Sequence, residues 1–172
     1  MQKYHITIRI LHWLIGVSVL LMIAIGYMMT NYLPDSTRFA LYPGHKAVGF
    51  TVLLLMFFRI LARALTKSPK MPKEISKLEA FVSKLVHFLL YFLVIVTATS
   101  GYVMSCASGK TISWFGLFNV PLFIGQNKYL AATAHGLHSV LPYVLLSFIF
   151  LHILGTLKHL LFDKVNIIKR IT

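Results

Sequence analysis

Long uncharged stretches constrain this sequence more than any other feature. Three of them contain no acidic or basic residue, and they lie at residues 10–34, 85–109 and 129–157. A helix needs about 20 apolar residues to cross the hydrocarbon core of a bilayer, so each stretch is long enough to span it. A fourth hydrophobic stretch, residues 41–65, is interrupted only by Lys46 near its start and by Arg59 and Arg63 near its end.

The composition agrees with a membrane protein. Hydrophobic residues make up 58% of the 172 residues and charged residues only 12%, whereas a soluble domain carries about 25% charged residues. A water-soluble globule and a disordered chain are therefore excluded. We predict a single-domain (residues 1–172), all-α integral membrane protein, a four-transmembrane-helix bundle. Its helices are expected at residues 8–30, 42–65, 78–105 and 129–162, with a short polar connection at residues 31–41.

The charge balance is strongly basic, with 17 Lys and Arg against 4 Asp and Glu. In a soluble protein this excess would suggest nucleic acid, but here it is better explained by membrane topology and lipid headgroups. Thirteen of the seventeen basic residues lie in the N-terminus, the linker at residues 66–77 with its flanks, and the C-terminal tail. The positive-inside rule therefore predicts that both termini and this linker are cytoplasmic.

Histidines are the unusual feature of so apolar a chain. Six of the eight fall within the predicted helices, where an ionisable side chain is costly and marks a candidate functional site. A lone histidine of this kind is more often a hydrogen-bonded packing residue, but six together favour a site. They sort into two levels, with His12, His87 and His152 near the cytoplasmic ends of their helices and His45, His135 and His138 near the outer ends.

A spacing of fourteen residues recurs among these histidines. His138 and His152 are fourteen residues apart, which brings them within about 40° of the same helix face and ~21 Å apart along the axis. His135 differs from His152 by ~100° and points elsewhere. The same interval leads from His12 to Gly26, from His87 to Gly101 and from His45 to Arg59. Each level thus has two histidines on different helices, and the outer level also has a glycine on each of two neighbouring helices.

The residue types indicate which metal or cofactor such a site would bind. Zinc prefers tetrahedral sites with several close His, Cys or carboxylate ligands, and di-iron bundles need Glu-x-x-His pairs, whereas these helices contain only Glu79 at a helix start. A single cysteine, Cys106, excludes an iron–sulfur cluster, and no Cys-x-x-Cys-His motif exists for covalent haem attachment. Haem needs two axial ligands, which a histidine pair supplies. Two b-type haems within the bundle fit the pattern best.

The sequence also resembles the bacterial cytochrome b561 family over nearly its whole length. The resemblance rests on an ordered set of motifs: Leu11-His12-Trp13, Gly44-His45, Arg59 with Arg63, His87-Phe88-Leu89-Leu90-Tyr91, Ser100-Gly101-Tyr102-Val103-Met104, Trp114-Phe115, His138 with His152, and Lys158-His159. It implies a dihaem cytochrome of the bacterial inner membrane that exchanges electrons with quinone and, in one branch, oxidises superoxide. Two positions depart from the family pattern. His135 is an additional outer histidine, and Ala98 stands where a proline is expected.

Pairing the histidines by level assigns the haem ligands. His12 and His152 are the expected ligands of the inner haem iron, and His45 and His138 those of the outer haem iron. The resemblance implies the same four ligands.

Other residues of the helices are expected to line the cofactors. Gly26 and Gly101 would make room for porphyrin at the outer level, because glycine has no side chain. Arg59 would pair with inner haem propionates or a quinone oxygen, the alternative being extension to the lipid headgroups. His87 and His159 are expected to hydrogen-bond quinone or relay its protons, the alternative being packing or interface roles.

The outer loops suggest an electron donor. They carry Arg38, Lys46, Lys110 and Lys128 against only Asp35, and such a field would steer a small anion. We therefore expect superoxide to donate electrons at the outer face, with Lys110 and Lys128 steering it, and ubiquinone to accept them at the inner face. One alternative is a haem b anchor subunit that passes electrons between a hydrogenase or dehydrogenase and quinone. Another is a transporter that uses histidines as metal or proton sites.

Overall fold

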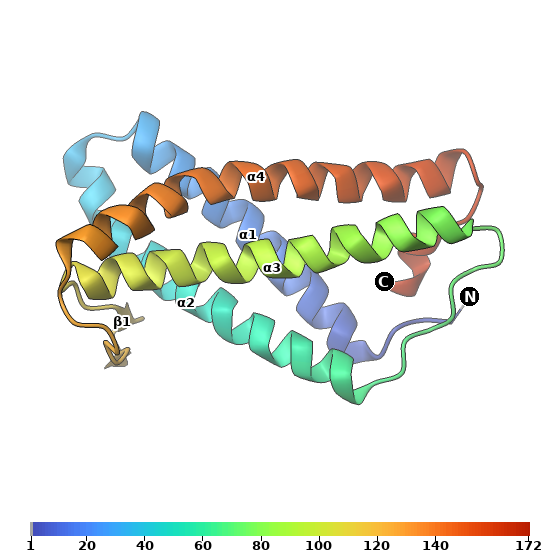
Figure 1. Cartoon of the computed structure of the whole chain (residues 1–172), viewed down its shortest axis with the longest axis horizontal. Coiled ribbons are helices and arrows are strands. Elements are labelled where there is room, and N and C mark those ends of the chain that lie inside the picture. The colour runs from blue at the N-terminus through green and yellow to red at the C-terminus, as the bar shows by residue number, and fades with distance from the viewer. Residues whose placement is uncertain (1) are drawn as a thin grey trace.

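Four long helices make up most of the molecule (Figure 1). The computed structural model describes residues 2–172, and its helices are α1 (Ile6–Asn31), α2 (Asp35–Leu65), α3 (Lys77–Ala107) and α4 (Lys128–Leu161). All four are long and apolar enough to cross a membrane. The predicted all-α fold with four membrane-spanning helices is therefore confirmed.

The helix boundaries differ most from the prediction at α2. This helix begins at Asp35, seven residues before the predicted start, so residues 35–41 of the predicted polar connection are helical. Pro34 precedes the helix with an extended backbone, and Asp35 supplies a negative charge to its first turn, where the helix dipole favours an anion. The helix also contains Pro43. The polar residues therefore form the outer end of a helix that is longer than the hydrophobic stretch.

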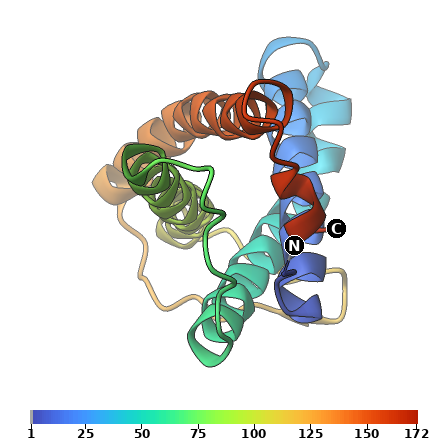
Figure 2. The ribbon, with the colours of Figure 1, turned by 90° about the vertical axis from the view of Figure 1, so that its right-hand side faces the viewer.

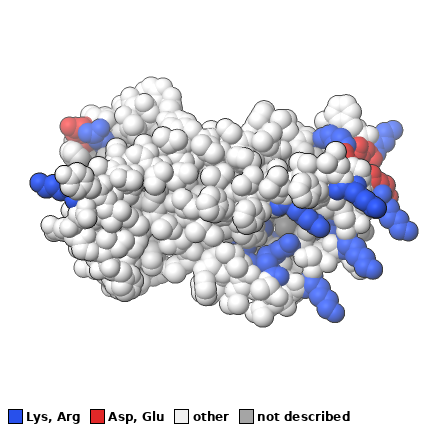
Figure 3. Space-filling view, viewed as in Figure 1, with Lys and Arg blue, Asp and Glu red and all other residues white. Residues whose placement is uncertain are grey.

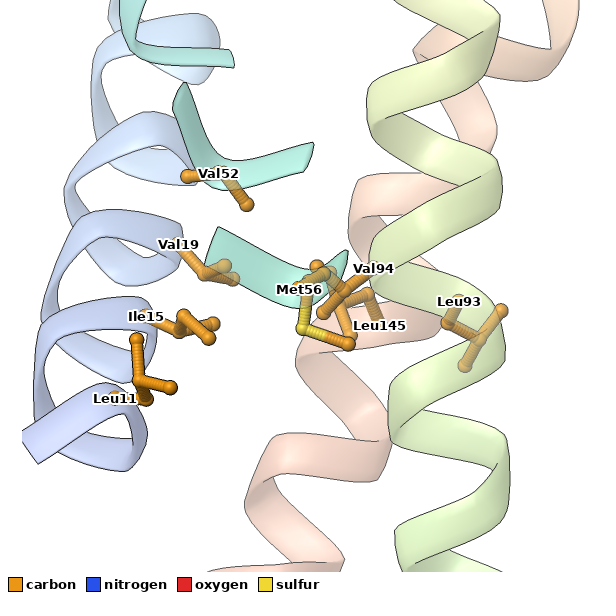
Figure 4. Close-up of a cluster of buried hydrophobic side chains, with 8 residues drawn as sticks. All are labelled: Leu11, Ile15, Val19, Val52, Met56, Leu93, Val94 and Leu145. Atoms are coloured by element: carbon orange, nitrogen blue, oxygen red, sulfur yellow. The ribbon is translucent and has the colours of Figure 1, made fainter. Parts of the chain in front are cut away.

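The helices pack as two antiparallel pairs. α1 lies mainly against α2 and α3 against α4, and α2 also contacts α3. A buried apolar cluster joins the pairs at mid-height (Figure 4), and it consists of Leu11, Ile15, Val19, Val52, Met56, Leu93, Val94 and Leu145. Within α4, Leu145 lies midway between His138 and His152. The apolar cluster therefore separates the two histidine levels.

The connections gather the two chain ends at one end of the bundle. A short 3₁₀ helix, η1 (Ile167–Arg170), follows α4, and the Tyr4 backbone N–H donates to the Arg170 carbonyl at 2.9 Å. The Arg170 guanidinium donates to the carbonyls of Pro69 and Lys70 in the linker between α2 and α3. Figures 1 and 2 show both termini beside this linker. We call this the inner end and the opposite end the outer end.

The outer end carries a small hairpin between α3 and α4. Its strands are β1 (Ser113–Trp114) and β2 (Phe118–Asn119), which pair antiparallel. Phe115 and Gly116 in the turn have positive φ angles of 51° and 78°. The Trp114 indole donates to Thr51 Oγ1 on α2 at 3.0 Å, which fixes the hairpin to the bundle.

Charged side chains are concentrated at the inner end, and the middle of the visible face is almost free of them (Figure 3). Many large hydrophobic side chains of the helices are exposed in the isolated chain, as expected for surfaces that face lipid. The charge asymmetry is the one that the positive-inside rule requires of a cytoplasmic inner end. The orientation itself remains a prediction.

Candidate functional site

Two histidine pairs bridge the helices at different heights. The inner pair is His12 on α1 with His152 on α4, and their ring centres lie 6.1 Å apart with the ring planes at 76°. The outer pair is His45 on α2 with His138 on α4, with ring centres 6.3 Å apart and planes at 88°. All four side chains are half-buried. The structure thus brings together the two pairs that the sequence predicted.

The spacing within each pair suits one metal ion between two imidazoles. A metal–imidazole bond is about 2.0–2.1 Å long, and roughly 1.1 Å separates each nitrogen from its ring centre, so two rings on opposite sides of one metal have centres about 6.3 Å apart. Both pairs lie close to this value. The rings of His87 and His152 are only 4.9 Å apart, which is too close for a metal between them. His87 is therefore a neighbour of the inner pair and does not take the place of His12.

The pairs do not form a zinc site of the usual kind. Within residues 2–172, one group of three possible ligand side chains has its ligand atoms within 4.8 Å of one another, and it consists of Glu79, His159 and Asp163. The ammonium of Lys158 contacts both carboxylates of that group, so a cation is already present there. Two-histidine sites without a third protein ligand fit b-type haem better than tetrahedral zinc.

The outer pair has one anchored and one unpartnered histidine. His138 Nδ1 lies 2.9 Å from the Thr97 carbonyl, to which it donates, and 3.1 Å from Ser100 Oγ. Donation from Nδ1 leaves Nε2 unprotonated and free to bind a metal. The buried Nδ1 of His45 has no hydrogen-bond partner in the described chain. An unsatisfied imidazole nitrogen of this kind fits a site built for an additional group.

Two glycines lie directly against the outer pair. A Cβ added at Gly101 would meet His138 Cε1 at 2.9 Å and Nδ1 at 3.2 Å, and one at Gly26 would meet His45 Cε1 at 3.5 Å. Gly101 is therefore required by the position of the His138 imidazole itself. The predicted role of both glycines in admitting porphyrin stays a prediction.

A buried cation borders the inner pair. The Arg59 side chain is 8% exposed, and its Nη1 donates to the Ile8 carbonyl at 2.8 Å. Its Nη2 lies 3.3 Å from His12 Nδ1, and the guanidinium lies 5.4 Å from the centre of the Tyr91 ring. His87 packs on the other histidine of the pair, and its Nδ1 donates to the Ser83 carbonyl at 2.6 Å. Arg59 and His87 are thus both brought to the inner pair, as expected from their level.

His159 lies farther toward the inner end. It follows His152 by seven residues, which is about 10 Å along a helix. The side chain is buried, and its Nδ1 lies 2.6 Å from Asp163 Oδ2. Lys158 bonds to the same carboxylate at 2.8 Å, and this ammonium together with His159 lowers the pKa of Asp163 below its usual value. The structure therefore separates His159 from the inner pair and couples it to an ionised carboxylate.

The outer end contains an open basic pocket of about 360 Å³ between α2, α3 and α4. Lys46, Lys110 and His135 line it together with the hydroxyl-bearing Tyr42, Ser105 and Ser108, and no acidic residue contributes to it. Lys46 directly follows His45, and His135 precedes His138 by three residues, so the pocket lies beside the outer pair. Lys128, the second predicted steering residue, begins α4 and is not among the lining residues.

Several contacts of the site could not be anticipated from the sequence. Thr97 and Ser100 bind His138, yet small polar residues are common in membrane helices. The one feature of the sequence that could have indicated this role is that Thr97 and Ser100 lie close to Gly101 within the apolar α3. Tyr91 was part of the quoted family motif, but nothing in the sequence linked it to Arg59.

The chain is similar over nearly its whole length to known cytochromes b561. The family model described as prokaryotic cytochrome b561 matches residues 3–172. The chain is 29% identical over 170 residues to cytochrome b561 homolog 2 of Escherichia coli (strain K12), covering 98% of this chain and 90% of that protein. It is 26% identical over 175 residues to cytochrome b561 homolog 1 of the same organism, covering 99% and 97%.

Proposed function

Since this chain belongs to the prokaryotic cytochrome b561 family of haem b electron-transfer proteins, we propose that it holds two b-type haems and is a superoxide:ubiquinone oxidoreductase of the bacterial inner membrane. The observation that carries the proposal is the presence of two histidine pairs, one at each level, with ring-centre spacings of 6.1 and 6.3 Å. His12 with His152 and His45 with His138 are the proposed iron ligands. When bound, the haems supply reversible one-electron transfer across the bundle.

The two histidine pairs would hold the haems through protein ligands alone. Because each iron would be bound by both histidines of a pair, it would have no free position for binding or activating dioxygen. The chemistry left to the site is electron transfer at the two ends of the bundle. The apolar cluster around Leu145 lies between the two levels.

The outer pocket supports superoxide as the electron donor. Superoxide is a small anion, and the pocket combines the ammonium groups of Lys46 and Lys110 with His135 and three hydroxyl groups. A basic, acid-free pocket raises the local concentration of such an anion. Each superoxide gives up one electron there and leaves as neutral dioxygen, which these cations no longer hold. Lys128 is proposed to extend the field around the pocket rather than to touch the anion.

The inner end supports reduction of ubiquinone. Two electrons from two superoxide anions, with two protons from the cytoplasm, convert one quinone to one quinol. His159 is the proposed proton donor, because its hydrogen bond to Asp163 holds one ring nitrogen and leaves the other free. Arg59 and His87 are proposed to bind the quinone oxygens or haem propionates next to the inner pair.

Rapid mixing tests this proposal. Oxidised protein purified with its haems is mixed with potassium superoxide under anaerobic conditions in a stopped-flow spectrometer, and haem reduction and quinol formation are followed. We expect haem reduction within the mixing experiment, followed by quinol formation when ubiquinone is present. Replacement of His159 by Ala should slow quinol formation and leave haem reduction unchanged. If superoxide leaves both haems oxidised, the proposal fails and the alternative of a dehydrogenase or hydrogenase anchor takes its place.

A further inference from the structure

Arg59 is a buried cation without a carboxylate partner. Its side chain is 8% exposed, and none of the salt bridges found among residues 2–172 includes it. Burial of an unpaired charge is costly, and a guanidinium stays protonated in proteins. The neutral groups that hold it are the Ile8 carbonyl and the face of Tyr91. The charge is thus fixed in place without being neutralised by the protein.

The position of this charge is specific to one histidine pair. The Arg59 Nη2 atom lies 3.3 Å from Nδ1 of His12, a member of the inner pair. The exposed Arg63, one helical turn further along α2, instead packs on the ring of Tyr4 at 5.1 Å. The inner pair therefore has one cation in direct contact, and a second arginine nearby provides a natural control.

Within residues 2–172, no cation is a hydrogen-bond partner of either outer histidine, although Lys46 and Lys110 line the pocket beside the pair. His138 donates its Nδ1 proton to the Thr97 carbonyl, and such a hydrogen bond makes an imidazole a more strongly donating ligand. Lys46 follows His45 in the sequence, but its ammonium donates to the Thr111 carbonyl at 3.4 Å in the outer pocket. The Thr97 carbonyl at the outer level and the Arg59 guanidinium at the inner level therefore shift the reduction potentials of their two sites in opposite directions.

We propose that Arg59 makes the inner haem site the more oxidising of the two and so biases electron exchange toward the quinone side. The inference rests on the two-haem site of the proposed function. Reduction adds one negative charge, which a fixed cation stabilises. The carbonyl bonded to His138 favours the oxidised state instead. One electron therefore moves from the outer to the inner site with a favourable equilibrium, and no proton is needed for that exchange.

Redox potentiometry of the purified protein, followed by optical spectroscopy, tests the assignment. Arg59→Gln should lower the midpoint potential of the inner haem by at least about 59 mV, which corresponds to a tenfold change in its one-electron reduction equilibrium. The outer haem should keep its midpoint. Arg59→Lys retains the charge and should shift the inner haem less. Arg63→Gln is the matched control, and because Arg63 packs on Tyr4 and not on the inner pair, it should shift the inner midpoint much less than Arg59→Gln.

Single-haem variants identify the two components and give a second measurement. His152→Ala should keep the outer haem and His138→Ala the inner one, and the inner midpoint should be the higher of the two. An inner midpoint at or below the outer one overturns the proposal, even if Arg59→Gln does not assemble. Equal midpoints in Arg59→Gln and wild-type protein also overturn it. A wild-type protein with fewer than two haems would instead contradict the proposed function, so the two failures are distinguishable.

Discussion

At the scale of single residues, the tightest constraint in the site is at Gly101. Its missing Cβ would lie 2.9 Å from His138 Cε1, a distance at which one of the two groups must move. Thr97 and Ser100 hold the same imidazole from α3, so the ring has little freedom to yield. The geometry of the outer pair therefore depends on the absence of one methyl group.

Gly101→Ala is expected to displace His138 and weaken outer haem binding. Overpacking of this kind costs about 1–3 kcal/mol, and 1.4 kcal/mol corresponds to about a tenfold loss of affinity. Haem content of the purified variant, measured as the pyridine haemochrome, should fall toward one per chain. Gly136→Ala is the control, because a Cβ at Gly136 meets no atom within 4 Å. Full haem content in both variants would refute the steric argument.

At the scale of elements, the ends of α2, α3 and α4 together form the outer pocket. The charge of the outer loops alone predicted Lys110 and Lys128 as the steering residues. The fold brings Lys110 to Lys46 and His135 and leaves Lys128 outside the lining. The contributions of these lysines should therefore differ.

Neutralising Lys46 and Lys110 together to Gln should slow reduction of the outer haem by superoxide without altering the haem spectrum. Lys128→Gln is the matched control and should have a smaller effect. The rate in the wild-type protein should also fall as salt is added, because the Debye length is only about 8–10 Å near physiological ionic strength. Stopped-flow traces at several salt concentrations measure both effects. Equal rates in the double variant and the wild type would exclude the pocket as the superoxide site.

Much of the element structure was predictable, and the exceptions have physical causes. Hydropathy located all four helices because a bilayer requires about 20 apolar residues per span. It missed the start of α2 at Asp35, because residues 35–38 are polar and precede the apolar stretch. The depth of the histidines along the predicted helices gave the pairing of His12 with His152 and of His45 with His138. The sequence could not predict the contact between Arg59 and Tyr91, because this contact depends on the packing of α2 against α3.

At the scale of the whole molecule, both histidine pairs cross between the two helical hairpins. α1 packs on α2 and α3 on α4, whereas His12 and His45 come from the first hairpin and their partners from the second. The ion pair of Glu79 with Lys158 lies within the second hairpin. A group bound between the histidines would therefore connect the hairpins.

Loss of haem is expected to destabilise the assembled bundle. A ligand that binds only the folded state stabilises it in proportion to the logarithm of its concentration over its Kd. The variant His12→Ala with His45→Ala, which removes one ligand from each pair, should therefore unfold at a lower temperature in detergent than the wild type. His135→Ala, outside both pairs, is the control and should unfold at the wild-type temperature. An unchanged unfolding temperature in the double variant would argue against this bridging role.

The haem count of purified variants tests most directly whether the two histidine pairs each hold one b-type haem. The wild-type protein should contain two low-spin haems b per chain. His152→Ala and His138→Ala should each contain one, and His135→Ala should contain two. Retention of two bis-histidine haems in His152→Ala, or loss of a haem in His135→Ala, would contradict the assignment of the ligands.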